Sequence, residues 1–168
     1  MPEFSAGTKL TAEKLSRKGV KLWGRRTSNS SASTGTETSV LRLDDAALKA
    51  LRHIVVQVSG IHLESSVVSD ALKVQIRYTT DASTPTTSST VLPGSVLYGR
   101  EVVANSSETT ALNVSYETGS SDETLSVLLT VTRIAGTGNC ILHASSTDCL
   151  DMRIVDVGPA VGNTGTAL

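Results

Sequence analysis

The sequence predicts an all-β protein whose body is an antiparallel β-sandwich or jelly-roll-like fold. The apolar content is 39%, but aromatic residues supply only 3%, so Val, Leu, Ile and Ala must fill the core. Such β-branched richness favours sheets. Apolar and polar residues alternate with period two in several segments, which places one face of each strand inward. Segments rich in Ser, Thr and Gly separate these runs, as turns separate short strands.

The alternating runs predict both the strands and the core. In 72–78 four apolar residues alternate with three polar ones, and the same alternation covers 112–117 and 125–131. Half-buried antiparallel strands have this pattern. The segments 140–144 and 150–157 supply two further strands. The predicted core consists of Ile54, Val56, Val58, Leu72, Val74, Ile76, Leu112, Val114, Leu125, Val127, Leu129, Leu142, Met152 and Ile154.

Two segments depart from simple alternation. In 54–63 the inward positions shift from even to odd numbers across Gly60, as a single bulge residue would cause. The segment 44–53 competes with a strand assignment, because Asp44 or Asp45 can cap a helical turn that has apolar residues beneath it. Turns are predicted at 79–90, 92–94, 118–122 and 136–139.

The charges divide the chain unevenly. Up to Arg26 there are seven basic and two acidic residues, whereas the rest of the chain has eight basic and fourteen acidic residues. Near the start, Thr11 can cap a short helix that ends before Gly19. The predicted parts are a basic docking arm (1–26), a Ser/Thr-rich linker or strap too polar to bury itself (27–38), the sandwich (39–159) and a C-terminal tail (160–168).

The arm carries apolar residues among its cations and is too short to bury them within itself. A basic arm suits nucleic acid, an anionic membrane or an acidic protein surface, and a solvated tail is the simplest alternative. We expect a protein partner, because no aromatic-studded basic patch accompanies the arm and no run approaches the roughly 20 apolar residues of a membrane span. The predicted docking residues are Phe4, Leu10, Leu15, Lys18, Lys21, Leu22, Trp23, Arg25 and Arg26.

No sequence pattern indicates catalysis, a metal or a cofactor. His53, His62 and His143 lie in or beside predicted strands, without the helical spacing of a metal-binding pair. The serines lack a G-x-S-x-G elbow. Asp151 and Asp156 fall on opposite faces of a regular strand, which makes them a poor acid–base pair. We therefore expect a protein that is not an enzyme, and a small hydrolase is the least favoured alternative.

Two cysteines, Cys140 and Cys149, are too few for a disulfide framework and lack the companions of a zinc site. The interval between them would allow them to face each other on paired strands. Residues 1–15 contain no continuous apolar segment of the signal-peptide kind, so we expect assembly in a cytoplasm. Reduced core thiols follow from that expectation.

Both ends of the chain resemble one group of proteins. Residues 4–15 read FSAGTKLTAEKL, which resembles the opening F-x-A-G-x-x-L-T-A-x-x-L of many small virion proteins of tailed bacteriophages, especially those infecting actinobacteria. Residues 150–159, LDMRIVDVGP, are similar to the last strand of those proteins, which often closes with an acidic residue, an apolar residue and Gly-Pro. One departure is that a basic stretch, 17–26, and the Ser/Thr-rich segment stand between the motif and the sandwich.

The resemblance implies a structural role on the virion, with copies assembled around symmetry axes as a homo-oligomer and a trimer favoured. The leading expectation is a capsid decoration or head-fibre protein that binds the major capsid protein or other virion proteins through its arm. The alternative is a minor tail or baseplate protein whose sandwich binds a host surface. Few aromatic side chains are available to stack on a sugar, and Trp23 lies in the arm, which favours the first expectation.

Overall fold

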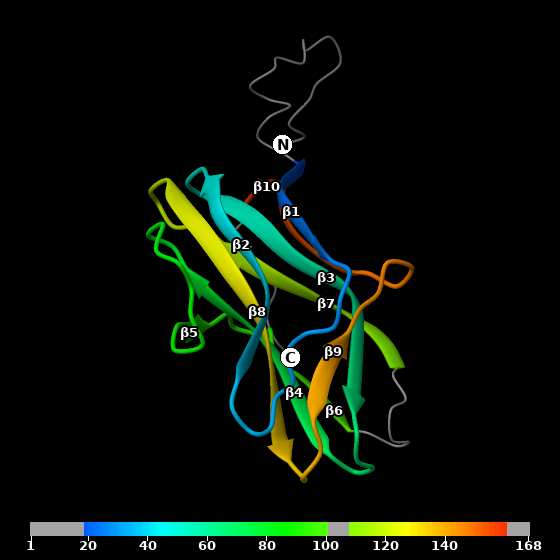
Figure 1. Ribbon diagram of the computed structural model, residues 1–168. Helices are drawn as coiled ribbons and strands as arrows, with labels where there is room; N and C mark the ends of the chain where they lie inside the picture. Colours follow the sequence, from blue (N-terminus) through cyan, green and yellow to red (C-terminus); the bar gives the residue numbers. More distant parts are fainter. Residues whose placement is uncertain (1–18, 101–107, 161–168) are drawn as a thin grey trace, which may run out of the picture.

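A computed structural model describes residues 19–100 and 108–160 of the chain (Figure 1). Within these ranges the secondary structure is entirely β, with two antiparallel sheets and no helix, which confirms the predicted fold class. The short helix expected near Thr11 lies outside the described residues. The strands are β1 (Gly19–Arg26), β2 (Thr38–Leu48), β3 (Arg52–Ser65), β4 (Ala71–Thr79), β5 (Thr90–Val91), β6 (Leu97–Arg100), β7 (Glu108–Glu117), β8 (Glu123–Ala135), β9 (Cys140–His143) and β10 (Leu150–Pro159).

The two sheets face each other as the layers of a sandwich (Figure 1). Sheet A has the strand order β1-β10-β3-β7, and β9 also pairs with β3. Strands β9 and β10 follow one another along the same edge of β3, because β7 occupies the other edge. Sheet B has the order β2-β8-β4-β5, and β6 pairs with β4 beside β5. Strand β1, which directly follows residues 1–18, is therefore an edge strand of sheet A.

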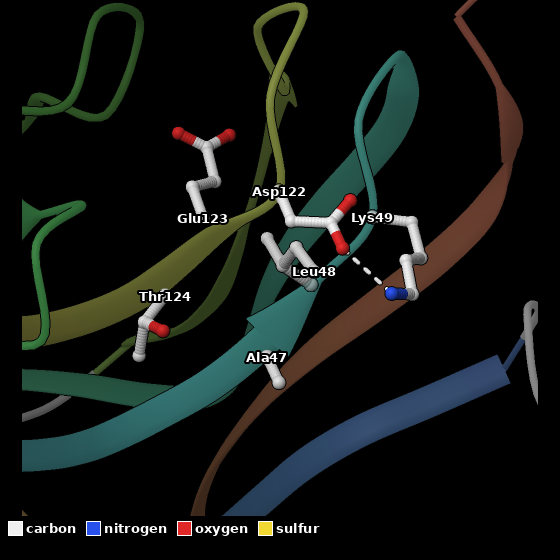
Figure 2. A pocket seen from close by; sticks show the side chains of 6 residues that line it. All are labelled: Ala47, Leu48, Lys49, Asp122, Glu123 and Thr124. Atoms are coloured by element: carbon white, nitrogen blue, oxygen red, sulfur yellow. Dashed lines mark hydrogen bonds and ion pairs between the residues drawn. The ribbon is translucent and has the colours of Figure 1, made fainter.

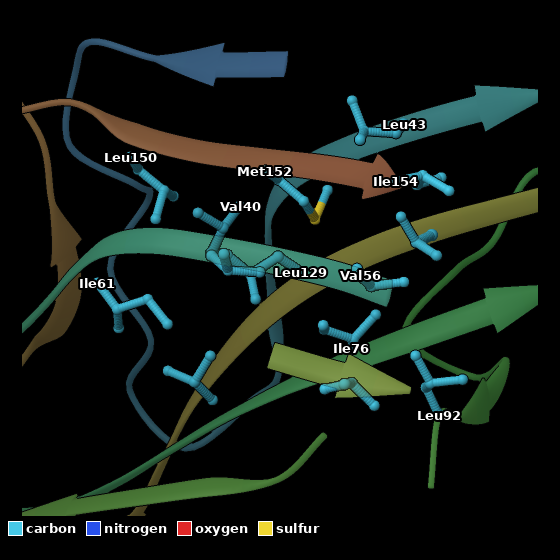
Figure 3. Packing of buried hydrophobic residues seen from close by; sticks show 14 of the residues in the cluster. Val40, Leu43, Val56, Ile61, Ile76, Leu92, Leu129, Leu150, Met152 and Ile154 are labelled. Atoms are coloured by element: carbon cyan, nitrogen blue, oxygen red, sulfur yellow. The ribbon is translucent and has the colours of Figure 1, made fainter. Parts of the chain in front are cut away.

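The core fills the space between the sheets, where aliphatic side chains from both layers interdigitate (Figure 3). Every predicted core residue is buried except Leu112, which is half-buried. Leu112 lies on β7 at the open edge of sheet A, where no further strand covers it among the described residues. The core also includes residues that the prediction omitted, namely Val40, Leu43, Ala46, Leu48, Ile61, Leu92, Val131, Ala144 and Leu150.

The bulge predicted at Gly60 is confirmed. The register between β3 and β7 shifts between Val58 and Ile61, and both of these side chains point into the core. Gly60 has a φ of +70°, and a Cβ there would lie 2.1 Å from the carbonyl oxygen of Cys149. Only glycine suits this backbone conformation and this close approach.

The helical alternative for 44–53 is wrong. Strand β2 continues to Leu48, because Ala46 and Leu48 enter the core with period two and pair with β8 across from Leu125 and Glu123. The aspartates that could cap a helix instead lie at an irregularity in the strand. Asp45 has a φ of +65°, and its N–H donates to the Ser126 hydroxyl at 3.0 Å.

Part of the predicted arm belongs to the sandwich. Residues 19–26, which the charge pattern assigned to the arm, form β1 and pair with β10. The Ser/Thr-rich segment is a strap that runs along β9, where the Ser30 and Ser33 N–H groups donate to the carbonyl oxygens of Leu142 and Cys140 at 2.9 and 2.7 Å. Both serines are buried. Hydrogen bonds to β9 thus hold a segment whose one apolar side chain, that of Ala32, is exposed.

Neither cysteine takes part in a disulfide in the structure; Cys140 is buried and Cys149 is half-buried. Cys140 pairs with Ser65 of β3, whereas the Cys149 backbone lies beside Gly60. These two positions are separated along the same edge of β3 by roughly 16 Å. The cysteines therefore do not face each other on paired strands, contrary to the arrangement that their spacing allowed.

Candidate docking surface

Strand β1 is clamped to β10 on its outer face by a bidentate ion pair. Arg25 donates from Nε and Nη2 to the two carboxylate oxygens of Asp151 at 2.8 and 3.0 Å. This hydrogen bonding with Arg25 holds the pKa of Asp151 below its usual range, against a smaller opposing effect of burial. The Arg25 guanidinium also lies 5.2 Å from the centre of the Trp23 ring, within reach of a cation–π interaction. Trp23 is thereby oriented on the outer face, where 52% of it remains exposed.

On the inner face, at the opposite end of the β1–β10 pairing, the sandwich encloses charged side chains. Arg52 of β3 and Asp156 of β10 form a buried ion pair, with Nη2 to Oδ1 at 2.9 Å and side-chain exposures of 7% and 1%. Lys21 of β1 approaches the other carboxylate oxygen at 3.7 Å, and the Gly158 N–H donates to Oδ1 at 3.0 Å. The cluster joins three neighbouring strands of sheet A below the point where residues 1–18 enter.

Arg26 ties the end of β1 to the strap and to sheet B. Its guanidinium donates to the carbonyl oxygens of Ser28, Asn29 and Val40 at 2.8, 2.6 and 2.7 Å. Arginine suits this position because its donors are arranged as a rigid planar fork. Three cations that the sequence assigned to docking therefore contact their own chain.

Of the predicted docking residues, Phe4, Leu10, Leu15 and Lys18 lie outside the described residues. Leu22 packs against the core. Trp23 is the member on β1 that presents an apolar surface to solvent. The docking role of the whole set stays a prediction, but its described members are brought together on one edge strand. The sequence did not reveal that Lys21, Arg25 and Arg26 stabilise the sheet, because their acceptors belong to segments distant along the chain or to backbone carbonyls.

An apolar patch lies on the outer face of sheet A beside this clamp. Val20, Val155 and Val55 stand directly opposite one another on β1, β10 and β3. Val20 and Val157 are 57% and 47% exposed. We call this surface the outer patch; it consists of Val20, Trp23, Val55, Val155 and Val157.

Elsewhere, two histidines that are distant in sequence meet on sheet A. His62 and His143 are register partners on β3 and β9, and their ring centres are 6.4 Å apart. His62 Nε2 lies 3.1 Å from an Asp148 oxygen and 2.8 Å from the Thr109 hydroxyl. The pairing of β9 with β3 was not visible in the sequence, so this contact was missed. Among residues 19–100 and 108–160 no group of three or more His, Cys, Asp or Glu side chains is placed to hold a metal ion.

Two shallow hollows lie at the ends of strands in sheet B. One, of about 200 Å³, is lined by residues 47–49 and 122–124, and an ion pair of 2.6 Å between Lys49 Nζ and Asp122 Oδ2 crosses it (Figure 2). The other, of about 370 Å³, is lined by Tyr78, Asp81 and six Ser and Thr side chains. In the second hollow the Ser83 hydroxyl donates to an Asp81 carboxylate oxygen at 2.5 Å, and the Ser83 N–H donates to the same oxygen at 3.1 Å. The described residues include no helix long and apolar enough to cross a membrane.

Comparisons with known proteins give no family. No family model and no curated protein matches the sequence. Solved structures that are similar in arrangement include an Eiger TNF from S. frugiperda, 10% identical over 90% of this chain and 100% of that one, with a TM-score of 0.42. The VP2 subviral particle of infectious bursal disease virus is 10% identical over 82% of this chain and 37% of that one, with a TM-score of 0.41. CBM22-1-GH10 modules of a Clostridium thermocellum xylanase, complexed with xylohexaose, are 14% identical over 90% and 28%, with a TM-score of 0.38. Likenesses this distant carry no argument about function.

Proposed function

We propose that this protein is a non-enzymatic structural protein of a tailed-bacteriophage particle, of the capsid decoration or head-fibre type, attached to the shell through residues 1–18. The observation that carries the proposal joins the two ends of the chain. The arm motif ends at Leu15, four residues before β1 begins, and β1 pairs along its length with β10. Strand β10 is the second segment that resembles the phage proteins. The first similar segment, residues 4–15, thus leads into β1, and β1 pairs with the second similar segment, β10.

The clamp on β1 suits a tether. The Arg25–Asp151 pair, the buried Arg52–Asp156–Lys21 cluster and the Arg26 hydrogen bonds fix the strand from which the arm leaves. Tension on a docked arm would therefore reach the sheet through several strands rather than peel off a loose segment.

Apolar anchors and cations have different tasks in this attachment. Phe4, Leu10 and Leu15 supply affinity when a partner desolvates them, while the cations steer the encounter with an acidic surface. Residues 1–18 retain four basic and two acidic residues, because Lys21, Arg25 and Arg26 are used within the sandwich. The electrostatic contribution of the arm is correspondingly smaller than its sequence up to Arg26 implied. If the bodies form a trimer, three linked arms raise the effective concentration of each contact.

The location of the protein tests the proposal directly. We expect a reconstruction of the particle to show the protein on the shell, and quantitative mass spectrometry to give copy numbers comparable with those of the shell protein. Density only at the tail tip, with a few copies per particle, would overturn the decoration role in favour of the tail or baseplate alternative. Absence of the protein from purified particles would refute a virion role altogether.

Paired substitutions test the division of tasks. Phe4→Ala with Leu10→Ala should weaken attachment at physiological salt more than Lys14→Ala with Lys18→Ala, because desolvated apolar anchors contribute more affinity than screened surface charges. Lys21 is left out of the cation pair because it contacts Asp156 inside the sandwich. Equal or greater weakening by the lysine pair would show that the attachment is mainly electrostatic.

A further inference from the structure

The outer patch results from an inversion of the usual strand pattern. Over most of β10 the apolar side chains point inward, as Met152 and Ile154 do. At the end nearest the arm the order reverses, so that charged Asp156 is buried while Val155 and Val157 face outward. On β1 the reversal is repeated, with Lys21 inside and Val20 outside. On β3 Arg52 joins the buried charges, and Val55 faces outward between the buried Ile54 and Val56.

A solvent-facing sheet surface normally carries polar side chains. Three valines directly opposite one another, flanked by Val157 and Trp23, form an apolar surface of the kind that marks an interaction site, with the exposed Arg153 of β10 opposite Trp23 at its border. Five side chains, two of them half-buried, offer much less than the roughly 800 Å² per partner of a stable protein interface. The patch is therefore too small to hold a second copy by itself, but it is large enough for a peptide segment.

The chain places such a segment at the patch. Residues 1–18 join β1 at Gly19, immediately before Val20 of the outer patch. Gly19 has a φ of +105°, a backbone conformation that glycine adopts without steric cost, so the chain can turn sharply at this point. The patch spans three strands, about 10 Å across, and eighteen extended residues reach roughly 60 Å.

The two surfaces are also complementary in chemistry. Phe4, Leu10 and Leu15 need an apolar surface that the arm is too short to provide, and the outer patch is an apolar surface without cover among the described residues. Covalent linkage through a short connection gives effective concentrations in the millimolar range, so weak contacts suffice within one chain.

We propose that, in the free protein, residues 1–18 fold back in cis onto the outer patch and cover Val20, Trp23, Val155 and Val157. This latch goes beyond the attachment role and does not depend on it, because it concerns the protein before it meets any partner. It shields two apolar surfaces from non-specific association. When the protein attaches to the particle under the proposed function, the apolar residues of the arm leave the outer patch and bind the partner surface instead.

Trp23 is the one tryptophan in the sequence, so its fluorescence reports on the patch. The measurement compares the full chain, a chain lacking residues 1–18, and the full chain with Leu10→Ser and Leu15→Ser. A control chain carries Lys9→Ser and Lys14→Ser in the same segment. We expect acrylamide quenching to rise about twofold, with a red-shifted emission, in the deletion and the leucine variant but not in the lysine control, because the indole loses its apolar cover.

A second measurement starts from the patch. Val157→Lys should release residues 1–18, seen as faster amide hydrogen exchange in that segment of the full chain. Val68→Lys is a matched control, because Val68 is exposed to a similar extent, 50% against 47%, and lies in the β3–β4 turn at the other end of β3.

Three results would overturn the latch. The first is equal quenching of Trp23 in the full chain and the deleted chain. The second is equal exchange of residues 1–18 in the Val157→Lys and Val68→Lys chains. The third is protection of Trp23 from acrylamide that appears only as the protein concentration rises and light scattering detects oligomers. That result would place the arm on a neighbouring copy instead.

Discussion

Replacing Asp156 with Ala should destabilise the sandwich strongly at the end where the arm leaves. Asp156 is 1% exposed, and its carboxylate receives the Arg52 guanidinium at 2.9 Å and lies 3.7 Å from Lys21. Removal of the carboxylate takes this partner from a guanidinium that stays buried, and breaking a buried ion pair in this way costs about 3–5 kcal/mol. For a domain of this size we expect the Tm to fall by roughly 10 °C or more.

Urea unfolding at pH 7, followed by far-UV circular dichroism, measures the loss. The matched control is Lys49→Ala, which removes an ion pair with Asp122 whose side chains are 68% and 57% exposed. Exposed pairs contribute under about 1 kcal/mol, so the control should stay close to the wild type. A loss below about 1 kcal/mol for Asp156→Ala would refute the reasoning, because it would mean that water replaces the buried pair and that the charged cluster is open to solvent.

Three further predictions concern stability. Burial alone would raise the pKa of the Glu37 carboxyl, but hydrogen bonds from Arg77 and Thr130 lower it to about 2. The stability that this group contributes is therefore complete above its ordinary pKa of 4.5 and disappears as the pH falls through about 2. Urea midpoints between pH 5 and 2 should therefore fall less steeply in Glu37→Gln, and an unchanged slope would contradict the assignment. Gly60→Ala should lower the free energy of unfolding by about 2 kcal/mol or more, because the added Cβ would meet the Cys149 carbonyl oxygen in a backbone with a positive φ. Gly119→Ala is the control and should change the free energy of unfolding little, because a Cβ there meets nothing within 4 Å. Equal losses in the two variants would contradict the bulge geometry. Ile154→Ala should lower the free energy of unfolding by roughly 2–5 kcal/mol, and Leu112→Ala should lower it clearly less, because Leu112 is only half-buried at the edge of sheet A. A larger loss for Leu112→Ala than for Ile154→Ala would mean that another strand covers β7.

Side-chain periodicity was sufficient to predict the fold class, and nearly every residue that it assigned to the core is buried there. Alternation in β4, β8 and β10 places the same residues inward in the sequence and in the structure, and the phase shift at Gly60 identified the bulge in β3. Leu112 was the exception, because periodicity specifies which face a residue occupies but not whether its strand lies at the edge of a sheet.

Long-range pairing explains what the sequence did not reveal. Strand β1 was assigned to the arm because its cations read as a docking surface, and only the register with β10 brings Arg25 to Asp151 and Lys21 to Asp156. The inverted pattern around Asp156 was hidden for the same reason, since it needs three strands in register. Strands β5 and β6 are two and four residues long, too short for alternation to stand out between turns.

The most direct test of attachment through residues 1–18 uses phage particles assembled without this protein. Purified full-length protein and the chain lacking residues 1–18 are added to these particles in equal amounts. Deletion to Gly19 keeps β1 and its contacts with β10, whereas deletion to Arg26 would also remove a strand of sheet A. Circular dichroism should confirm that both proteins are folded, and quantitative mass spectrometry of the repurified particles measures what binds. We predict that the full-length protein binds and the deleted protein does not. Equal binding of the two would contradict attachment through the arm and would place the attachment surface on the sandwich itself.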